Sequence, residues 1–325
     1  MIYYYLNREE WPSSLNEMYD VCGITKQGFC QYFNRHKRHA EEQVYLIDII
    51  RQIRKDHPTM CCRYMYFKIN PSSMGRDRFE ALCRAHGFTI HKRRSKRRTT
   101  DSNGVVRFDN LVEGLDLDSV DQVWSSDITY FEIDNSFYYL TFILDCYSRK
   151  ILGYSVSNRL LTEQTTLPAL RMALKNRNWE IPSGVIFHSD GGGQYYEKKF
   201  LELTNKYAMK NSMCEYAYQN GKAERINGVI KNNYLKHWNI QSLNKLTNAV
   251  DRAVGLYNED KPHISLDRMT PNEYEKSLHK LATRNKSKMK ESFDAKNQIN
   301  RASSPDLSEQ NKSQNHDVIS AKMVE

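Results

Sequence analysis

The feature that most constrains the fold is a change in the period of the apolar residues near Asp121. After it, segments 122–131, 137–144 and 151–156 are rich in β-branched and aromatic residues and are predicted to be strands. The tight connection Asn135-Ser136 predicts that the first two strands pair as an antiparallel hairpin. The elements predicted next are a helix over 165–177, a short buried strand over 185–188, a helix over 198–207 and a last long helix over 220–238. This order is typical of one α/β domain of about 150 residues.

Before Asp121 the pattern is helical. Gly23 makes a turn and Thr25 is a candidate N-cap for a helix that carries Phe29, Tyr32 and Phe33 on one face. This is the outline of a helix-turn-helix.

Two further helices are predicted, over 41–56 and over 73–86, the second stopping at Gly87 in the usual C′ position. Their apolar side chains are Val44, Ile47, Ile50 and Ile53 in the first, and Phe79 and Leu82 in the second. The N-terminal region is therefore predicted to be all-α.

The formal net charge of +9 is concentrated at one end of the chain. Residues 1–100 carry +9, residues 101–280 carry −2 and residues 281–325 carry +2. Six cations fall within seven positions: Lys92, Arg93, Arg94, Lys96, Arg97 and Arg98. A basic arm on a near-neutral domain indicates a polyanionic partner, above all nucleic acid, because cations that neutralise phosphates release counterions. A solvated linker is the other interpretation of this run.

These patterns divide the chain into four parts. Residues 1–98 are predicted to be a helical, basic, helix-turn-helix-like DNA-binding region, and residues 99–120 a linker. Residues 121–276 form the α/β domain, and residues 277–325 a polar tail with too few apolar residues to offset the entropy of ordering. We expect this tail to be disordered.

The composition also indicates the cellular compartment. No apolar stretch approaches the about 20 residues of a membrane span, and the N-terminus lacks the basic segment of a secretory signal. The seven cysteines include no C-x-x-C pair, so a disulfide framework is not expected. Adjacent Cys61 and Cys62 cannot easily join His36 and His39 as tetrahedral zinc ligands. A cytoplasmic, nucleoid-associated protein without a membrane partner is expected.

Three carboxylates stand where their surroundings do not require one. Asp127 lies in the first predicted strand, Asp190 lies just past a later strand, and Glu224 lies in the first turns of the last long helix. Buried carboxylates must be paired or bound to a cation, and oxygen ligands select hard cations such as Mg²⁺. Two such ions about 4 Å apart can assist phosphodiester displacement. Taken singly, each residue also fits a solvated carboxylate, and Ser-Asp-Gly-Gly is typical of a surface turn.

Five ordered motifs between residues 121 and 274 resemble one family. They are Trp124-x-x-Asp127-Ile128-Thr129-Tyr130, Leu144-Asp145-x-Tyr147-Ser148-Arg149, His188-Ser189-Asp190-x-Gly192-x-Gln194-Tyr195, Asn220-x-x-Ala223-Glu224-Arg225-x-Asn227-Gly228-x-Ile230-Lys231 and Tyr257-Asn258-x-x-x-Pro262-His263-x-x-Leu266-x-x-x-Thr270-Pro271-x-Glu273-Tyr274. The set resembles the retroviral-integrase-type catalytic core. More narrowly, it resembles bacterial insertion-sequence transposases whose second reading frame encodes this domain.

The resemblance implies a ribonuclease-H-like mixed sheet flanked by helices, with an Asp-Asp-Glu active site and two bound Mg²⁺, which Mn²⁺ often replaces. Matched by position, Asp127, Asp190 and Glu224 would be the catalytic residues and the metal ligands. The implied reaction hydrolyses the ends of the element. The freed 3′-hydroxyl then attacks a second phosphodiester without a covalent protein intermediate.

The expected function is therefore that of a DNA transposase. Its implied partners are the terminal inverted repeats of its element, target DNA, further copies of itself on DNA, and a companion protein from the first frame. Two other interpretations stay open: a non-catalytic DNA-binding protein derived from a transposase, and a structure-specific nuclease of the same fold. The intact triad argues against the first, and the basic helical N-terminus argues against the second.

The last long helix is predicted to have two working faces. An apolar stripe packs on the sheet, and it consists of Ala223, Ile226, Ile230, Tyr234 and Trp238. The neighbouring face, directed at the active site, carries Glu224, Asn227, Gly228 and Lys231. Lys231 and Arg225 are candidate DNA contacts.

Three smaller features complete the prediction. Only 33 residues separate Asp190 from Glu224, slightly fewer than is usual in the family, which leaves open whether this copy is active. His188 is expected to pack or hydrogen-bond near the site. Tyr147-Ser148-Arg149 is interpreted as a turn, because no His/Asp spacing accompanies the serine.

Overall fold

The computed structural model describes residues 2–10, 13–90, 108–214, 217–281 and 283. Contacts gather residues Met1–Tyr274 into one compact unit and residues Glu275–Glu325 into a second. Within the described residues, no helix combines the length and the apolar character that crossing a lipid bilayer requires. The basic run from Lys92 to Arg98 and most of the predicted tail lie outside the described residues.

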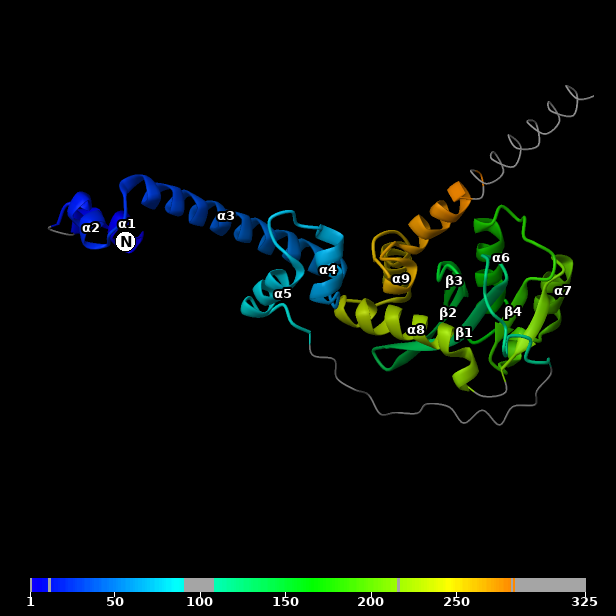
Figure 1. The fold of residues 1–325 in the computed structure, drawn as a ribbon. Helices are drawn as coiled ribbons and strands as arrows, with labels where there is room; N and C mark the ends of the chain where they lie inside the picture. Colours follow the sequence, from blue (N-terminus) through cyan, green and yellow to red (C-terminus); the bar gives the residue numbers. More distant parts are fainter. Residues whose placement is uncertain (1, 11–12, 91–107, 215–216, 282, 284–325) are drawn as a thin grey trace, which may run out of the picture. The chain divides into compact units, whose positions relative to one another are not determined.

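A five-stranded mixed sheet forms the centre of the α/β domain (Figure 1). Its strands, in the spatial order β3-β2-β1-β4-β5, are β1 (Val123–Ile133), β2 (Ser136–Asp145), β3 (Ile151–Ser157), β4 (Ile186–Ser189) and β5 (Lys210–Met213). β1 pairs antiparallel with β2 and β2 with β3, whereas β4 runs parallel to both β1 and β5. The predicted mixed sheet is confirmed. β5 was not predicted, because Lys210 and Asn211 occupy half of its four positions.

The predicted hairpin is also confirmed, but its turn lies one residue earlier than the predicted Asn135-Ser136. Ile133 pairs with Ser136, so Asp134 and Asn135 alone make the turn between β1 and β2. Their φ angles are 46° and 61°. Positive φ at both central positions matches the twist of the flanking strands, and aspartate and asparagine tolerate it better than most residues.

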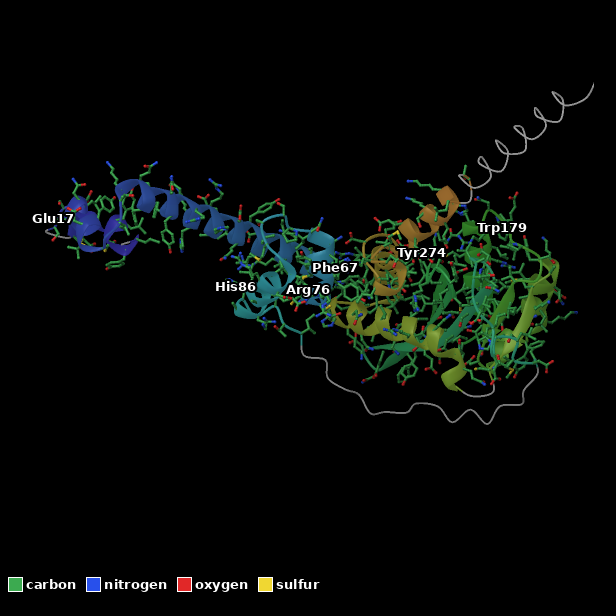
Figure 2. The ribbon with its side chains drawn as sticks, in the orientation of Figure 1. Glu17, Phe67, Arg76, His86, Trp179 and Tyr274 are labelled. Atoms are coloured by element: carbon green, nitrogen blue, oxygen red, sulfur yellow. The ribbon has the colours of Figure 1, made fainter. Side chains whose placement is uncertain are left out.

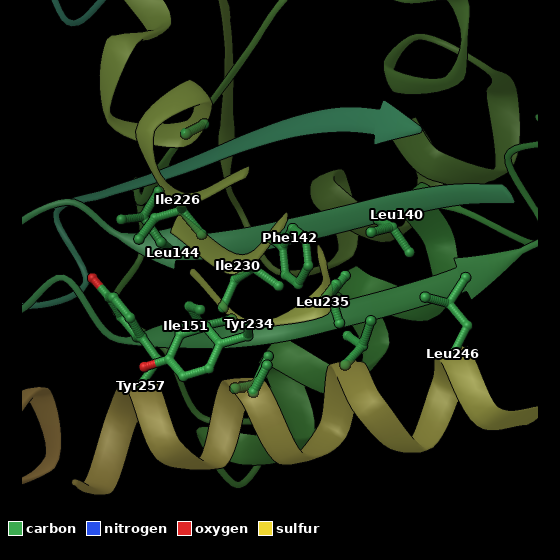
Figure 3. Packing of buried hydrophobic residues seen from close by; sticks show 14 of the residues in the cluster. Leu140, Phe142, Leu144, Ile151, Ile226, Ile230, Tyr234, Leu235, Leu246 and Tyr257 are labelled. Carbon is green, nitrogen blue, oxygen red and sulfur yellow. The ribbon is translucent and has the colours of Figure 1, made fainter. Parts of the chain in front are cut away.

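Two pairs of helices cover the sheet, one pair on each face. α6 (Thr166–Asn176) and α7 (Lys198–Lys206) pack on what we call the α6/α7 face, with Trp124, Ile143 and Leu152 of the strands. α8 (Gly221–Asn233) and α9 (Leu243–Glu259) pack on the opposite, α8/α9 face. Figure 3 shows this second core, in which Leu140 and Phe142 of β2 meet Ile230 of α8 and Leu246 of α9. The helices flank the sheet as predicted.

One helix boundary was predicted wrongly. α8 ends at Asn233 instead of reaching Trp238, because Tyr234 adopts φ −125° and ψ −72° and a short 3-10 turn follows. Neither proline nor glycine marks this break in the sequence. α8 is also not the last long helix, since the 17 residues of α9 follow it. The predicted stripe nevertheless packs on the sheet, with Tyr234 buried and Trp238 partly buried.

The described N-terminal residues are helical, as predicted. The helices are α1 (Ile2–Leu6), α2 (Leu15–Val21), α3 (Lys26–Asp56), α4 (Cys62–Ile69) and α5 (Arg76–Ala85). The Thr25 hydroxyl accepts a hydrogen bond from the Gly28 amide at 3.0 Å and caps α3, and Gly23 turns the chain before it with φ 64°. α2 and α3 thus form the predicted helix-turn-helix outline.

Two details of this region differ from the prediction. The helix expected over 41–56 is the second half of one helix of 31 residues, because nothing in the sequence interrupts it after Thr25. Val44 is 60% exposed and Leu46 takes its place in the core. α5 begins at Arg76 and is capped by His86 (Figure 2), with Phe79 and Leu82 buried as predicted. Five 3-10 turns also occur in the described residues: Arg8–Glu10, Gly193–Tyr195, Ala217–Asn220, Leu235–His237 and Ile264–Leu266. Residues 271–281 form a further helix, so the described start of the predicted tail, residues 277–281, is helical and not disordered as predicted.

Candidate active site

Asp127 lies on the central strand β1, and its side chain is on the face of the sheet that α8 covers. Its Oδ2 accepts a hydrogen bond of 2.7 Å from the Nδ2 of Asn227 on that helix. A strand places alternate side chains on opposite faces, so Ser125 and Thr129 point the same way as Asp127. The α8/α9 face of β1 therefore carries a row of polar side chains with Asp127 at its centre.

Asp190 reaches the same place from the neighbouring strand. β4 runs parallel to β1, with Ser189 opposite Ser126. The residues that follow these two serines, Asp190 and Asp127, therefore lie at the same level of the sheet. The Asp190 Oδ1 accepts a hydrogen bond of 3.2 Å from the amide of Gly192. A Cβ at Gly192 would stand 3.1 Å from that oxygen, so glycine there gives the carboxylate room. The register of β1 and β4 thus brings the two aspartates together.

Glu224 lies in the first turn of α8, and its side chain is exposed. The start of this helix is fixed by the buried Asn220, which bonds to β1 twice. Its Oδ1 accepts from the Ser125 hydroxyl at 2.6 Å, and its Nδ2 donates to the Ser126 carbonyl at 2.9 Å. α8 is therefore attached to β1 directly beside Asp127. The N-terminal turn of a helix also favours a carboxylate electrostatically.

The other two carboxylates act on Asp127. Burial, then the negative charges of Asp190 and Glu224, raise the pKa of Asp127 to about 7. Burial also raises the pKa of Asp190. Negative charges that gather around a buried carboxylate in this way concentrate negative potential, which a divalent cation would neutralise.

The donor chemistry fits Mg²⁺, because all three side chains offer carboxylate oxygens. Even so, no group of three or more acidic, histidine or cysteine side chains in the described residues could hold a metal ion as it stands. Asp127 and Asp190 are held by hydrogen bonds, whereas Glu224 is exposed and has other rotamers open to it. To complete a metal site, the Glu224 side chain above all would therefore have to adopt another rotamer.

The other residues singled out in the sequence have structural partners. His188 is buried, with its Nδ1 3.0 Å from the Ser212 hydroxyl of β5, as expected for a packing role. The amides of Tyr147 and Ser148 donate to the Asp145 Oδ1 at 2.9 Å and 2.7 Å, and φ at Arg149 is 60°. Tyr147-Ser148-Arg149 is thus a turn, as predicted.

Of the predicted DNA contacts, two can be placed. Lys231, two turns beyond Glu224, is half-buried, and its Nζ donates to the Thr129 hydroxyl at 2.8 Å. Arg225 is exposed beside Glu224. Both cations lie on the helix that carries the glutamate.

Sequence reasoning placed Asn227 on the helix face directed at the active site and named Asn220 only as a motif residue, but it did not predict their hydrogen bonds. Both are buried, and both hold Asp127 or its strand. Tyr195 is a third such residue, its hydroxyl lying 2.9 Å from that of buried Ser126. A buried polar side chain needs a partner, so an asparagine next to the apolar stripe of the helix was the available signal at Asn227.

The chain is similar to known protein families and to proteins of insertion elements. The integrase core domain family matches residues 118–218, and a second family of the same description matches residues 206–271. The insertion element IS600 uncharacterized 31 kDa protein of Shigella sonnei is 26% identical over 275 residues, covering 82% of this chain and 100% of that protein. The transposase InsF for insertion sequence IS3A of Escherichia coli (strain K12) is 34% identical over 113 residues, covering 34% of this chain and 38% of InsF.

Solved structures were also compared. The HTLV-2 integrase catalytic core domain in complex with magnesium (trimeric form) is 22% identical, with a TM-score of 0.39, and the match covers 47% of this chain and 95% of that one. The catalytic core domain of BIV integrase gives 16% identity and a TM-score of 0.37, covering 50% of this chain and 99% of that one.

Proposed function

We propose that the chain is an insertion-sequence transposase with an integrase core domain, and that it cuts DNA at the ends of its own element and joins the freed ends to a target. We assign catalysis and metal binding to Asp127, Asp190 and Glu224. One observation carries the proposal: burial and the charges of both other carboxylates raise the pKa of Asp127, and all three residues lie inside the segments that the integrase core families match. A buried carboxylate with two further acidic residues acting on it suits a cation-dependent reaction.

The carboxylates of Asp127 and Asp190, joined by Glu224 from α8, would hold Mg²⁺ or Mn²⁺, whose chemistry is to activate an attacking oxygen and stabilise a leaving one. Asn227 orients Asp127 through its 2.7 Å hydrogen bond. Asn220 keeps the start of α8 against β1. Lys231 and Arg225 would bind phosphates of the DNA strand, and the basic run from Lys92 to Arg98 would contribute further phosphate contacts.

The proposed partners follow from this activity. They are the terminal inverted repeats, target DNA, further copies of the chain assembled on DNA, and a first-frame companion protein. The proposed compartment is the cytoplasm, at the nucleoid.

The test is a joining assay with labelled terminal DNA and Mg²⁺ or Mn²⁺. Asp127→Asn, Asp190→Asn and Glu224→Gln should each lower cleavage and joining by about a thousandfold or more, because each removes charge that the transition state needs. All three should still bind DNA. Glu202→Gln, at an exposed carboxylate of α7, is the matched control and should retain activity.

Each other outcome has a defined meaning. A triad variant that still joins strands would remove that residue from the site. A parent protein that cleaves without joining would support the nuclease interpretation, and one that binds terminal DNA without cleaving it would support the non-catalytic one.

A further inference from the structure

The central strand β1 continues past the end of its neighbour β4. β4 pairs with β1 only from Val123 to Ser126, whereas β1 pairs with β2 as far as Ile133. Among the described residues, therefore, β1 has no strand partner on that side from Asp127 onward. We call this stretch, residues 127–133, the open edge. It begins at the active-site aspartate.

Two aromatic rings are exposed where the open edge ends. Tyr130 of β1 is 47% exposed and Phe137 of β2 is 51% exposed. Their ring centroids are 5.4 Å apart, and the rings are nearly perpendicular at 89°. Both side chains project from the sheet face opposite α8, because Thr129 and Phe131 take the α8 side of β1. We call this pair the aromatic platform. An exposed aromatic pair of this kind is informative, whereas a single exposed apolar residue is not.

A cation sits beside the platform. The Lys231 Nζ lies 4.9 Å from the centre of the Tyr130 ring and donates to the Thr129 hydroxyl. Thr129 and Tyr130 are successive strand residues and point to opposite faces, so an ammonium that contacts both must lie at the open edge. Lys231 therefore lies between the α8/α9 face, which carries Asp127, and the platform on the opposite face.

An aromatic surface next to a cation is what single-stranded DNA requires, since a base stacks on the ring and a phosphate meets the charge. Tyr130 lies three residues beyond Asp127 along β1, a rise of about 10 Å, which is the length of about three stacked nucleotides. Glu132 lies opposite Phe137 in the hairpin and is exposed. Its negative charge disfavours a phosphate at that end and leaves Lys231 as the phosphate position.

We propose that Tyr130 and Phe137 bind an unpaired base of the DNA strand, about three nucleotides from the phosphodiester held at Asp127, with Lys231 on the adjoining phosphate. This deepens the proposed function and rests on it, because it assumes that DNA occupies the active site. A strand end that frays before cleavage would place its first unpaired base on the platform. Fully paired DNA would leave the platform unused.

The experiment measures binding of the full chain, without divalent metal, to two fluorescent probes. One is a duplex with three unpaired nucleotides at its end, carrying 2-aminopurine there, and the other is the same duplex fully paired. Tyr130→Ala and Phe137→Ala should each weaken binding of the unpaired probe by about 5- to 150-fold and abolish 2-aminopurine quenching. Binding of the paired probe should not change.

Conservative variants and a distant aromatic supply the controls. Tyr130→Phe and Phe137→Tyr keep a ring and should behave like the parent, which also separates lost stacking from lost folding. Trp179→Ala removes a ring that is 46% exposed after α6 (Figure 2), and it should change nothing. Lys231→Gln should weaken the binding of both probes and make that binding less dependent on salt.

The proposal would be overturned if the alanine variants lost affinity equally for both probes, or if they lost none. So would a change in oligomeric state by sedimentation with unchanged DNA affinity, because the platform would then be a contact between copies of the chain. The two proposals fail separately. Quenching by a parent that cannot join strands would reject only the proposed function, and joining by a parent that never quenches would reject only the platform.

Discussion

The two faces of the sheet differ in how they are built. On the α6/α7 face, buried apolar side chains pack between the strands and the helices, and Gly153 of β3 lies directly under α6. The α8/α9 face has an apolar core as well, but over β1 a row of polar contacts replaces it. These contacts pair Ser125 with Asn220, Asp127 with Asn227, and Thr129 with Lys231.

This difference separates the stability of the fold from the function of the site. On the α6/α7 face, an atom added beneath α6 would clash with its neighbours, so the free energy of unfolding should respond strongly to substitution there. Along the polar row, each hydrogen bond contributes little net stability, but the one from Asn227 orients Asp127, to which we assign metal binding. Three predictions test the distinction.

The largest effect is expected at Gly153. A Cβ there would lie 2.2 Å from the Ala169 carbonyl oxygen and 2.7 Å from the Ala173 nitrogen, both backbone atoms of α6. Gly153→Val should therefore lower the free energy of unfolding by about 3 kcal/mol or more, measured by urea denaturation. Gly255→Ala is the matched control, because a Cβ at this position of α9 would meet nothing within 4 Å. That variant should be neutral or stabilising by up to about 1 kcal/mol. A fully stable Gly153→Val would mean that the two faces do not differ as described.

The second prediction compares two buried asparagines of the α8/α9 face. Asn258 bonds to both the amide and the carbonyl of Ile151, at 2.9 Å each, so Asn258→Ala should cost about 1–3 kcal/mol of stability and leave Mn²⁺ affinity unchanged. Asn227 bonds to Asp127, so Asn227→Ala should lower Mn²⁺ affinity by about 10- to 100-fold. Titration calorimetry and denaturation of both variants measure the two quantities. If the two variants behave alike, the polar row has no special link to the site.

The smallest effect concerns pH. Burial, helped by nearby cations, lowers the pKa of His263 to about 3, and its ring lies 4.8 Å from that of Tyr257 on α9. The unfolded chain binds a proton here near pH 6.5 and the folded chain does not, so stability is lost as pH falls from about 6.5 towards 3. His263→Gln should flatten the decline in unfolding free energy between pH 7.5 and 5. His237→Gln, at an exposed histidine, should keep the parental slope. Identical slopes for parent and His263→Gln would contradict the prediction.

Most of the fold was readable from local patterns. Alternation and β-branched residues predicted β1 to β3, and Asn135 marked the hairpin turn. β5 was missed because Lys210 and Asn211 occupy half of its four residues, and only its position next to β4 makes it a strand. The end of α8 at Tyr234 was missed for the opposite reason: its residues favour a helix, and tertiary packing stops it.

The site was predictable in its residue types but not in its geometry. Chemistry singled out Asp127, Asp190 and Glu224, and the helical period correctly placed Asn227 and Lys231 on the face towards Asp127 and Thr129. The pairing of Ser126 with Ser189, which brings the aspartates together, depends on strand register, which one sequence does not reveal. The aromatic platform was missed for the same reason, because it exists only where β4 stops before β1 does.

The attachment of Asn220 to β1 has a consequence for how such chains can vary. Because its two hydrogen bonds set where α8 begins, residues can be inserted or deleted between Cys214 and Asn220 without shifting the register of the helix. The slightly short spacing before Glu224 then alters only what the connecting segment can reach. If the segment between Cys214 and Asn220 is replaced by that of a relative, the DNA preference should consequently change to that of the relative, while Glu224 keeps its position.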